Sequence, residues 1–320
     1  MRLLRIRERS QAHKARHQSL PATETASVLN DRAPPGYRRP WIPIGVIPAV
    51  GFLALFFALP FLILVYYSLL TVEQGRVVGG PSLQGYARFL TDPFTYFLFG
   101  RTLLLSGAVT VVCLLLGYPV AYLYTRLRST VTRTILLGTI ITPLLTSSLV
   151  LAFGWIVILG RQGVLNELLV ALDVIDERIS ILFTIEAVFI GMVQVHLPFM
   201  IVPLIATLRG IPPELEQAAA DLGASGWQTF WKVTIPQSVP GITAGMSLVF
   251  VLAYTAFTVP TLMGGASLQL VSVYIWNNVR LLSWSSAAVI ASLLLLTSLA
   301  VIVALTAVSR YLTRWQRLSP

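Results

Sequence analysis

The sequence predicts an all-α, polytopic membrane protein with six transmembrane helices. Hydrophobic residues make up 56% of the 320 positions and charged residues only 11%, whereas about a quarter of the residues in a soluble domain are charged. Six segments also reach the roughly 20 mainly apolar residues that a helix needs to cross a bilayer. A soluble fold could not hide this much apolar surface, so the expected solvent is lipid.

The six predicted spans are joined by mostly short, polar connections. The spans lie at about 43–69, 103–125, 134–159, 185–207, 241–263 and 287–309. Several spans contain prolines, namely Pro60, Pro119, Pro143, Pro198, Pro203 and Pro260. The backbone groups that proline frees must find partners in neighbouring helices or in a water-lined cavity. We therefore expect residues 43–309 to form one bundle of bent helices.

The positive charge is unevenly spread along the chain. Most of the 23 Lys and Arg residues lie in four pieces, 1–42, 126–133, 208–240 and 310–320. The positive-inside rule assigns such pieces to the cytoplasm. Both termini are therefore predicted to be cytoplasmic, together with the connection between the fourth and fifth spans.

The first 42 residues are polar and basic and have no apolar run near their start, unlike a secretory signal. We expect a disordered cytoplasmic tail, and a short cytoplasmic C-terminus at 310–320. The tail has no aromatic interleaving and no nucleic-acid motif, so no nucleic-acid partner is expected.

Two connections on the outer side contain local patterns. Residues 79–90 have turn residues followed by a short amphipathic piece, and residues 166–180 are expected to lie at the membrane interface as a helix. Neither connection is large enough to be a receptor domain. We therefore expect a separate protein to capture any ligand.

The longest polar interruption in the second half of the chain is the stretch 210–241. Pro212 and Pro213, followed by acidic residues, suit a helix N-terminus. Gly223 is the expected C-terminal glycine of that helix. Ser225 and Gln228 have the spacing of a capping box that opens a second helix.

The two predicted loop helices both have an apolar face. On the first helix this face contains Leu215, Ala218, Ala219 and Leu222, at helical spacing. On the second helix it contains Trp227, Phe230 and Trp231, and Pro236 is expected to end the helix. Each helix is shorter than the roughly 12–15 residues needed for marginal stability in water. Other parts of this chain or a partner must therefore cover the apolar faces of both helices.

Ionisable residues within a span are functional candidates, because burying them in lipid is costly. Glu186 lies near the outer end of the fourth span, where it either serves a solute path or reaches the interface. Gln194 and His196 lie mid-span, where they either line a polar passage or hydrogen-bond between helices. Glu186 and His196 are about 15 Å apart along a helix, which argues against a direct proton relay.

The chain lacks the patterns expected of an enzyme or a metalloprotein. Cys113 is the single cysteine, inside an apolar segment, and the three histidines cannot form a metal cluster. No catalytic residue, metal or cofactor is predicted. No Walker A motif is present either, so the energy source must be an ion gradient or another subunit.

The loop resembles the EAA loop of bacterial ABC importer permeases, whose pattern is E-A-A, three residues, G, nine residues, I-x-L-P. Gln217, Ala218 and Ala219 occupy the first three places, Gly223 the glycine, and 233–236 (V-T-I-P) the close. Gln217 stands where the family usually has glutamate. Glu216 precedes it, but is rotated by about 100° on a helix.

Further segments resemble the polyamine-type permeases of that family. They are GYPVAYLYTRL (117–127), FGWIVILGRQGVLN (153–166), the run 195–225 and AFTVPTLMGG (256–265). The resemblance thus extends over nearly the whole chain from about residue 42.

The resemblance implies a type I ABC importer permease-like bundle in a bacterial inner membrane. It implies three kinds of protein partner: a cytoplasmic ATP-binding subunit dimer, a second, non-identical permease and an extracytoplasmic solute-binding protein. Loop 210–240 would then dock on the ATPase and drive alternating access. The residues expected to carry the coupling are Glu216, Gln217, Ala218, Ala219, Gly223, Trp227, Phe230 and Pro236.

The resemblance favours a polyamine-like solute but leaves other cargoes open. The alternatives are an opine, a phosphonate, thiamine or ferric iron carried by the same machinery. A different class, a gradient-driven carrier, would need paired ionisable groups in the spans, and the sequence shows none.

Overall fold

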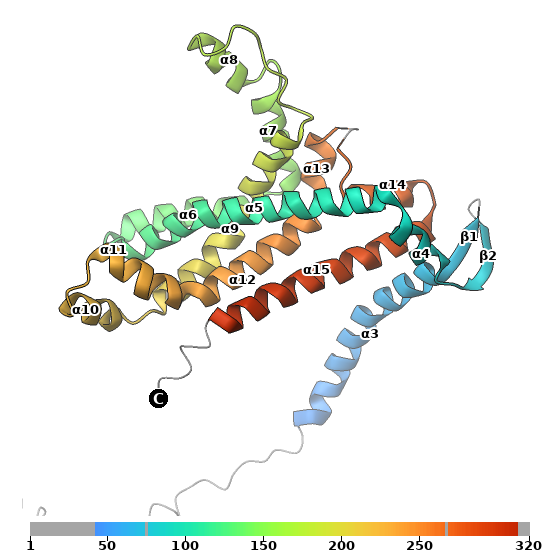
Figure 1. Ribbon diagram of the computed structural model, residues 1–320, viewed down its shortest axis with the longest axis horizontal. Coiled ribbons are helices and arrows are strands. Elements are labelled where there is room, and N and C mark those ends of the chain that lie inside the picture. The colour runs from blue at the N-terminus through green and yellow to red at the C-terminus, as the bar shows by residue number, and fades with distance from the viewer. Residues whose placement is uncertain (1–41, 74–75, 266–267, 313–320) are drawn as a thin grey trace, which may run out of the picture. The chain divides into compact units, whose positions relative to one another are not determined.

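The computed structural model describes residues 42–73, 76–265 and 268–312, and they are helical apart from one hairpin (Figure 1). The chain divides into two compact units, 1–60 and 61–320. In the first unit the described residues are the opening part of helix α3. All other elements belong to the second unit. The predicted tail and the last residues of the chain, 313–320, lie outside the described residues.

The elements follow one another along the chain as α3 (Ile42–Leu69), β1 (Leu70–Glu73), β2 (Arg76–Pro81), α4 (Gln84–Thr91), α5 (Pro93–Arg126), α6 (Thr130–Leu145), α7 (Ser148–Leu159), α8 (Val164–Ala171), α9 (Ile185–Arg209), α10 (Pro213–Asp221), α11 (Gly226–Thr229), the π-helical turn η1 (Phe230–Thr234), α12 (Ile235–Tyr254), α13 (Thr258–Met263), α14 (Val271–Arg280) and α15 (Trp284–Leu312).

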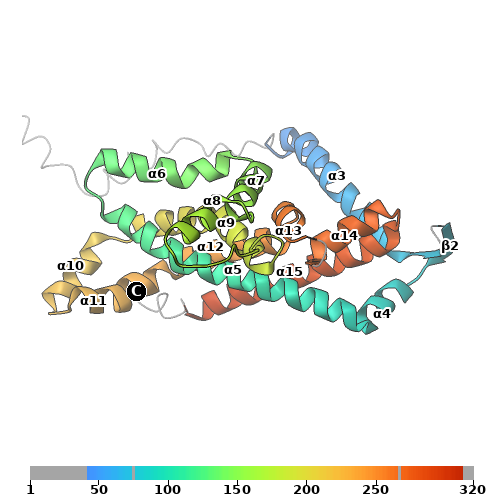
Figure 2. The same cartoon turned by 90° about the horizontal axis from the view of Figure 1, so that it is seen from above.

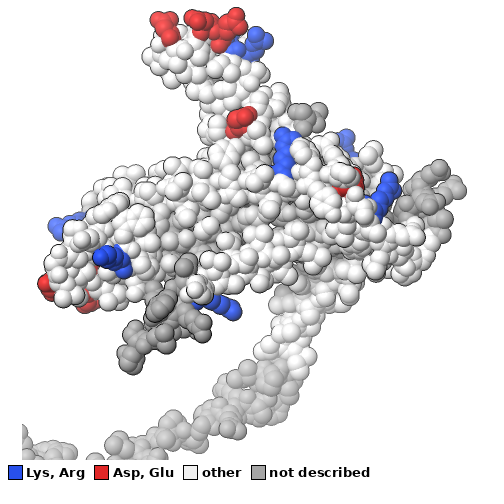
Figure 3. All heavy atoms as spheres, in the orientation of Figure 1, with Lys and Arg blue, Asp and Glu red and all other residues white. Residues whose placement is uncertain are grey.

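The all-α class and the number of spans are confirmed. In the described part of the chain, six helical stretches are long and apolar enough to cross a membrane: Val46–Leu69, Pro93–Arg126, Ser148–Ala171, Ile185–Arg209, Gly226–Tyr254 and Trp284–Tyr311. In the second unit, charged side chains gather around α10 and α11, near the opposite end of the bundle and around α8 (Figure 3). Most of the face between the two ends of the bundle is uncharged in that view, as expected of a surface in lipid.

The centre of the second unit is built by α5, α9 and α12, which pack against one another. Cys113 of α5, Met200 of α9 and Val249 of α12 are fully buried there. Glycines bring α12 close to α9: a Cβ on Gly245 would lie 2.7 Å from the sulfur of Met200, and one on Gly241 would lie 2.5 Å from Oγ1 of Thr207. Small residues at such contacts allow helices to pack closely in lipid.

The other helices surround this centre. Helix α6 packs against α9 and α15 against α12 and α14, and Figure 2 shows α6 at the edge of the second unit. The hairpin β1–β2 is antiparallel and is a small departure from the all-helical prediction. Helix α4 forms in the amphipathic piece expected at 79–90.

The prediction of one continuous third span at 134–159 was wrong. The chain forms two helices, α6 and α7, separated at Thr146 and Ser147, whose backbone is extended. Ser147 then caps α7 by accepting a hydrogen bond from the backbone N–H of Leu149 at 3.3 Å. Pro143 lies in the last turn of α6 and cannot donate a backbone hydrogen bond. The segment is apolar on both sides of the break, so apolar composition alone does not reveal it.

Two further boundaries differ from the prediction. The fifth span ends at Tyr254, the last residue of α12, and α13 follows as a separate short helix. In the stretch 166–180 only the opening part is helical, in α8. Asn166 is fully buried and exchanges two hydrogen bonds, both 2.9 Å, with the backbone of Ile179. The segment after α8 is therefore held as a closed loop.

Candidate functional site: the loop α10–α11 and the cleft beside it

The first loop helix, α10, has the start and end that its sequence predicts. Pro213 is its first residue, with Glu214 and Glu216 in the first turn. Gly223 follows the C-cap with a φ of 81°. Its N–H bonds the carbonyl of Ala220, and the N–H of Ala224 bonds that of Ala219. This is a Schellman motif, which requires a left-handed residue at the position of Gly223.

The predicted capping box opens the second loop helix. The Ser225 hydroxyl accepts from the backbone N–H of Gln228 at 3.3 Å, and the Gln228 side chain accepts from that of Ser225 at 3.0 Å. However, Pro236 does not end this helix. It lies in the first turn of α12, directly after the π-helical turn η1, and α11, η1 and α12 follow without a gap.

The loop aromatics form one cluster with an inner and an outer side. The rings of Trp227, Phe230 and Trp231 lie 5.5–6.0 Å apart. On the inner side, Phe230 makes edge contacts with Tyr118 and Tyr122 of α5, at 5.9 and 5.3 Å. On the outer side, Trp227 and Trp231 are 70% and 52% exposed.

The outer side continues onto α10. Leu222 at its end is 89% exposed, and Gln217 and Ala218 are also exposed. We refer to Leu222, Trp227 and Trp231 as the outer apolar face. The described part of this chain leaves this face uncovered.

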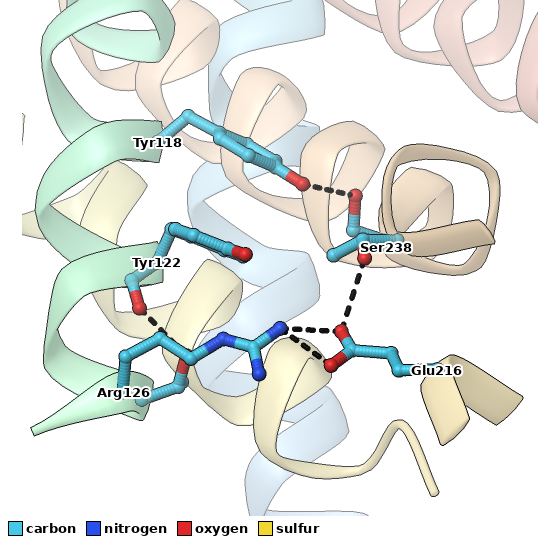
Figure 4. Close-up of polar contacts among 7 residues, drawn as sticks. Tyr118, Tyr122, Arg126, Glu216 and Ser238 are labelled. Carbon is cyan, nitrogen blue, oxygen red and sulfur yellow. Dashed lines mark hydrogen bonds and ion pairs between the residues drawn. The ribbon is translucent and has the colours of Figure 1, made fainter. Parts of the chain in front are cut away.

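Glu216 points towards the bundle (Figure 4). Its two carboxylate oxygens accept hydrogen bonds from the Arg126 guanidinium at 2.5 and 2.6 Å. The Thr234 hydroxyl also donates to this carboxylate, at 3.1 Å. Arg126 is the last residue of α5 and stacks on the ring of Tyr122, 4.9 Å from its centre. The pair therefore ties α10 to the end of α5.

A second polar contact, which is buried, joins α5 to α12. The hydroxyls of Tyr118 and Ser238 lie 3.0 Å apart in a buried environment (Figure 4). Ser238 also donates to the carbonyl of Ile235 at 2.8 Å. Sequence reasoning missed Arg126, Thr234 and this hydroxyl pair. The one available signal was that Tyr118, Tyr122 and Arg126 recur every four residues on α5.

A cleft of about 280 Å³ lies beside the Glu216 carboxylate. It is lined by residues from α5, α6, α9, α10 and η1, including Arg126, Arg133 and Arg209. Arg209 donates to the Tyr124 hydroxyl at 3.0 Å and stacks on that ring, and Arg133 stacks on the same ring. This basic cleft was not predicted, because its arginines come from three separate helices.

The predicted solute-path residues lie elsewhere, on α9. Glu186 is exposed in the first turn. The side-chain amide oxygen of Gln194 accepts a hydrogen bond from the indole N–H of Trp155 of α7 at 3.0 Å. His196 is 5% exposed, and its Nδ1 lies 2.6 Å from the carbonyl of Met192. The structure does not bring these three together, and their role in a solute path stays a prediction.

Within the described ranges, no three His, Cys, Asp or Glu residues come together as metal ligands would. The expectation that the chain carries no cofactor is a prediction that remains to be tested.

Comparison with known proteins identifies the class. Residues 113–314 match the family of binding-protein-dependent transport system inner membrane components. The chain therefore belongs to this family of ABC importer permeases, and is a multi-pass inner membrane protein.

Individual relatives agree with this assignment. The chain is 41% identical to the spermidine/putrescine transport system permease protein PotB of Salmonella typhimurium (strain SL1344), over 69% of this chain and 77% of that protein. Its fold is similar to that of a bacterial ABC transporter for the import of alginate, with a TM-score of 0.71 at 18% identity, covering 86% and 97% of the two chains. A bacterial alginate transporter in complex with a pentasaccharide-bound periplasmic protein gives a TM-score of 0.64 at 17% identity, covering 86% and 99%.

Replacing Gly223 with Ala tests the joint between the two loop helices. A Cβ there would meet no atom within 4 Å, so the cost is the backbone strain of a left-handed residue, roughly 1–2 kcal/mol. We expect the purified transporter to transport less solute for each ATP hydrolysed, because α10 and α11 lose their fixed angle. Parallel uptake and ATPase assays measure this ratio.

Gly226→Ala is the matched control. Gly226 opens α11, has no positive φ, and a Cβ there also meets no atom. Alanine is a better helix former than glycine, so this variant should couple normally. If the two variants behave alike, the Schellman joint has no role in coupling.

Replacing Glu216 with Gln tests the tie between α10 and α5. The Arg126 and Glu216 side chains are 47% and 22% exposed, so the pair contributes about 1 kcal/mol or less. We expect the thermal midpoint to fall by no more than about 2–4 °C. We expect ATP-driven uptake to fall severalfold, because α10 loses its ion pair to the end of α5.

Arg126→Gln should have the same effect, and combining the two changes should add little, since either one removes the whole interaction. Glu214→Gln is the control: it removes the same charge two positions earlier, at a residue that forms no ion pair in the described chain. An equal loss of uptake in the control would mean that net loop charge, and not the tie, matters.

Proposed function

We propose that this chain is the membrane-spanning subunit of an ATP-driven importer, and that loop 210–240 receives the force from a cytoplasmic ATPase. The observation that carries the proposal is the outer apolar face formed by Leu222, Trp227 and Trp231. Large apolar side chains grouped on a polar loop mark an interaction surface, and tryptophan is enriched where interfaces bind most tightly. Family membership supplies the class of the partner.

The contacts behind this face provide a path for the force. Phe230 links the exposed tryptophans to Tyr118 and Tyr122 of α5. Glu216 links α10 to the same helix through Arg126. Helix α11 continues through η1 into α12. A displacement of the loop would therefore move α5 and α12 together, as rigid elements packed at the centre of the bundle.

This geometry offers a reason why the chain tolerates Gln217 at the usual glutamate position. Gln217 is exposed, whereas Glu216 is turned inward and held by Arg126. We propose that Glu216 fixes the loop to the bundle and that Gln217 faces the ATPase, to which its amide offers a hydrogen bond in place of a charge.

The proposed solute is a polyamine-class cation. The support is the 41% identity to PotB, a spermidine/putrescine system permease. The described spans contain few carboxylates, among them Glu167 and Glu186. Strong recognition of a polycation would therefore reside in a binding protein, while this chain provides passage. Gln194, His196 and Glu186 remain the proposed contacts along the path.

The assembly proposed around this chain has four further components. They are two ATP-binding subunits, a second and non-identical permease, and an extracytoplasmic solute-binding protein. The similar alginate transporter in complex with a periplasmic protein supports the last in kind. The charge distribution supports placing both termini, and the loop, in the cytoplasm.

Uptake by the reconstituted transporter tests the proposed function. Proteoliposomes containing this permease and its co-expressed partners should accumulate radiolabelled spermidine only with ATP and the binding protein present. Uptake without ATP that collapses with the ion gradient would instead identify a gradient-driven carrier. Stimulation by a different solute would retain the importer and overturn the polyamine assignment.

Truncating Trp227 to Ala tests the docking surface. Removing a large aromatic anchor from an interface costs about 2 kcal/mol or more, which corresponds to about thirtyfold weaker binding. We expect the ATPase subunit to co-purify poorly with this variant, while the permease itself stays monodisperse in detergent.

Trp284→Ala provides the control for this truncation. Trp284 is also exposed and opens α15, far from the loop in the chain. Its truncation should leave ATPase association unchanged. If the Trp227 variant retains the ATPase as well as the control does, the outer apolar face is not the docking surface.

A further inference from the structure

The cleft beside the loop contains more positive than negative charge. Arg126 ends α5, Arg133 lies in the opening turns of α6, and Arg209 ends α9, and all three line the cleft with Glu216. The single carboxylate is already engaged in a bidentate contact with Arg126. Within the described residues, Arg133 and Arg209 form no ion pair. Two guanidinium groups therefore share this space without a neutralising anion.

The two unneutralised arginines are held close together by one ring. Tyr124 is 2% exposed, and the guanidinium carbons of Arg209 and Arg133 lie 4.9 and 5.2 Å from its ring centre. Arg209 also donates to its hydroxyl. These contacts position the charges but do not cancel them. The two like charges repel each other, and an anion between them would relieve this repulsion.

Arg133 also has a donor that the protein leaves unused. Its Nε is buried and has no hydrogen-bond partner in the described part of the chain. Leaving a buried donor unsatisfied is costly, and native structures seldom do so without a reason. An anionic ligand oxygen in the cleft would accept a hydrogen bond from this N–H and also neutralise the charge of Arg133. Arginine's planar fork matches the oxygens of a phosphate group in particular.

The position of the cleft indicates the source of the phosphate. Arg126 and Arg209 are the last residues of two membrane-spanning helices, which places them at the depth of lipid headgroups. Val131 and Ile135, on either side of Arg133 along α6, are 68% and 64% exposed, so apolar surface adjoins the charge. Basic pockets between transmembrane helices on the cytoplasmic side are suited to anionic headgroups.

We propose that Arg133 and Arg209 bind the phosphate of an anionic phospholipid, such as phosphatidylglycerol, from the leaflet on the side of the loop. The bound phosphate neutralises the two arginines and accepts a hydrogen bond from the unpaired Nε–H of Arg133. It lies next to the Arg126–Glu216 tie, so the lipid stabilises the end of α5 on which the loop rests. The inference concerns a site apart from the solute path and does not depend on which solute is transported.

Lipid binding to the complete transporter tests this inference. The complex, co-expressed with its partner subunits and delipidated, is titrated with dioctanoyl-phosphatidylglycerol, and bound lipid is counted by native mass spectrometry. Dioctanoyl-phosphatidylcholine and inorganic phosphate are titrated in parallel. We expect saturable binding of phosphatidylglycerol at least about tenfold tighter than that of either alternative. The choline cation of phosphatidylcholine is repelled by the arginines, and inorganic phosphate lacks the acyl chains that would contact the neighbouring apolar surface.

Arg133→Gln should weaken phosphatidylglycerol binding at least about tenfold, and Arg133→Lys, which keeps the charge but loses the fork, should weaken it less. Arg128→Gln is the matched control. Arg128 is exposed in the connection between α5 and α6, close to Arg133 in the chain, but does not line the cleft. It should bind phosphatidylglycerol as the unaltered transporter does.

Several results would overturn the proposal. Equal weakening in Arg128→Gln and Arg133→Gln would reduce it to general surface charge. Inorganic phosphate binding as tightly as phosphatidylglycerol would exclude the lipid as the source. Loss of the ATPase subunit from Arg133→Gln with unchanged lipid binding would make the cleft a partner contact. If Arg133→Gln does not assemble, equal binding of phosphatidylglycerol and phosphatidylcholine by the unaltered transporter is itself decisive against the site.

Discussion

The close packing of α9 against α12 is the constraint on which the rest of the second unit depends. At Gly241 and Gly245 there is no room for a side chain, because Thr207 and Met200 of α9 occupy the space that a Cβ would need. In lipid no hydrophobic force drives helices together, so close van der Waals contact has to do so. With α5 packed on the same pair, these three helices form the frame from which the loop projects.

The loop has two sides with different physical roles. Its inner side is tied to α5 by the Arg126–Glu216 pair and by the packing of Phe230 on Tyr118 and Tyr122. Its outer side presents tryptophan and leucine that this chain leaves exposed. A transmitting element needs both features, because an interface without an attachment to the bundle could move without moving the transmembrane helices. The ion pair contributes little to stability, and its value lies in fixing geometry.

The basic cleft shares Arg126 and Glu216 with the inner side of the loop. The attachment of the loop to α5 and the arginines proposed to bind lipid phosphate are therefore parts of one charged network. A change in the charge balance on one side of this network alters the field at the other. The lipid surface and the coupling element would thus be linked at the end of α5, although the cleft is not lined by the residues proposed for the solute path.

The sequence by itself determined the features that depend on composition or on residues a few positions apart. These include the membrane class, the number of spans, the Schellman glycine at Gly223 and the capping box of Ser225. Local hydrogen bonds and hydrophobic length fix them, so no tertiary information is needed. The structure corrected two local expectations, the continuous third span and the end of the second loop helix at Pro236. The tertiary structure alone decided what depends on distant neighbours, above all the inward direction of Glu216. Glu216 turns inward because Arg126, ninety positions earlier, ends its helix at the same place, and no local pattern encodes that meeting.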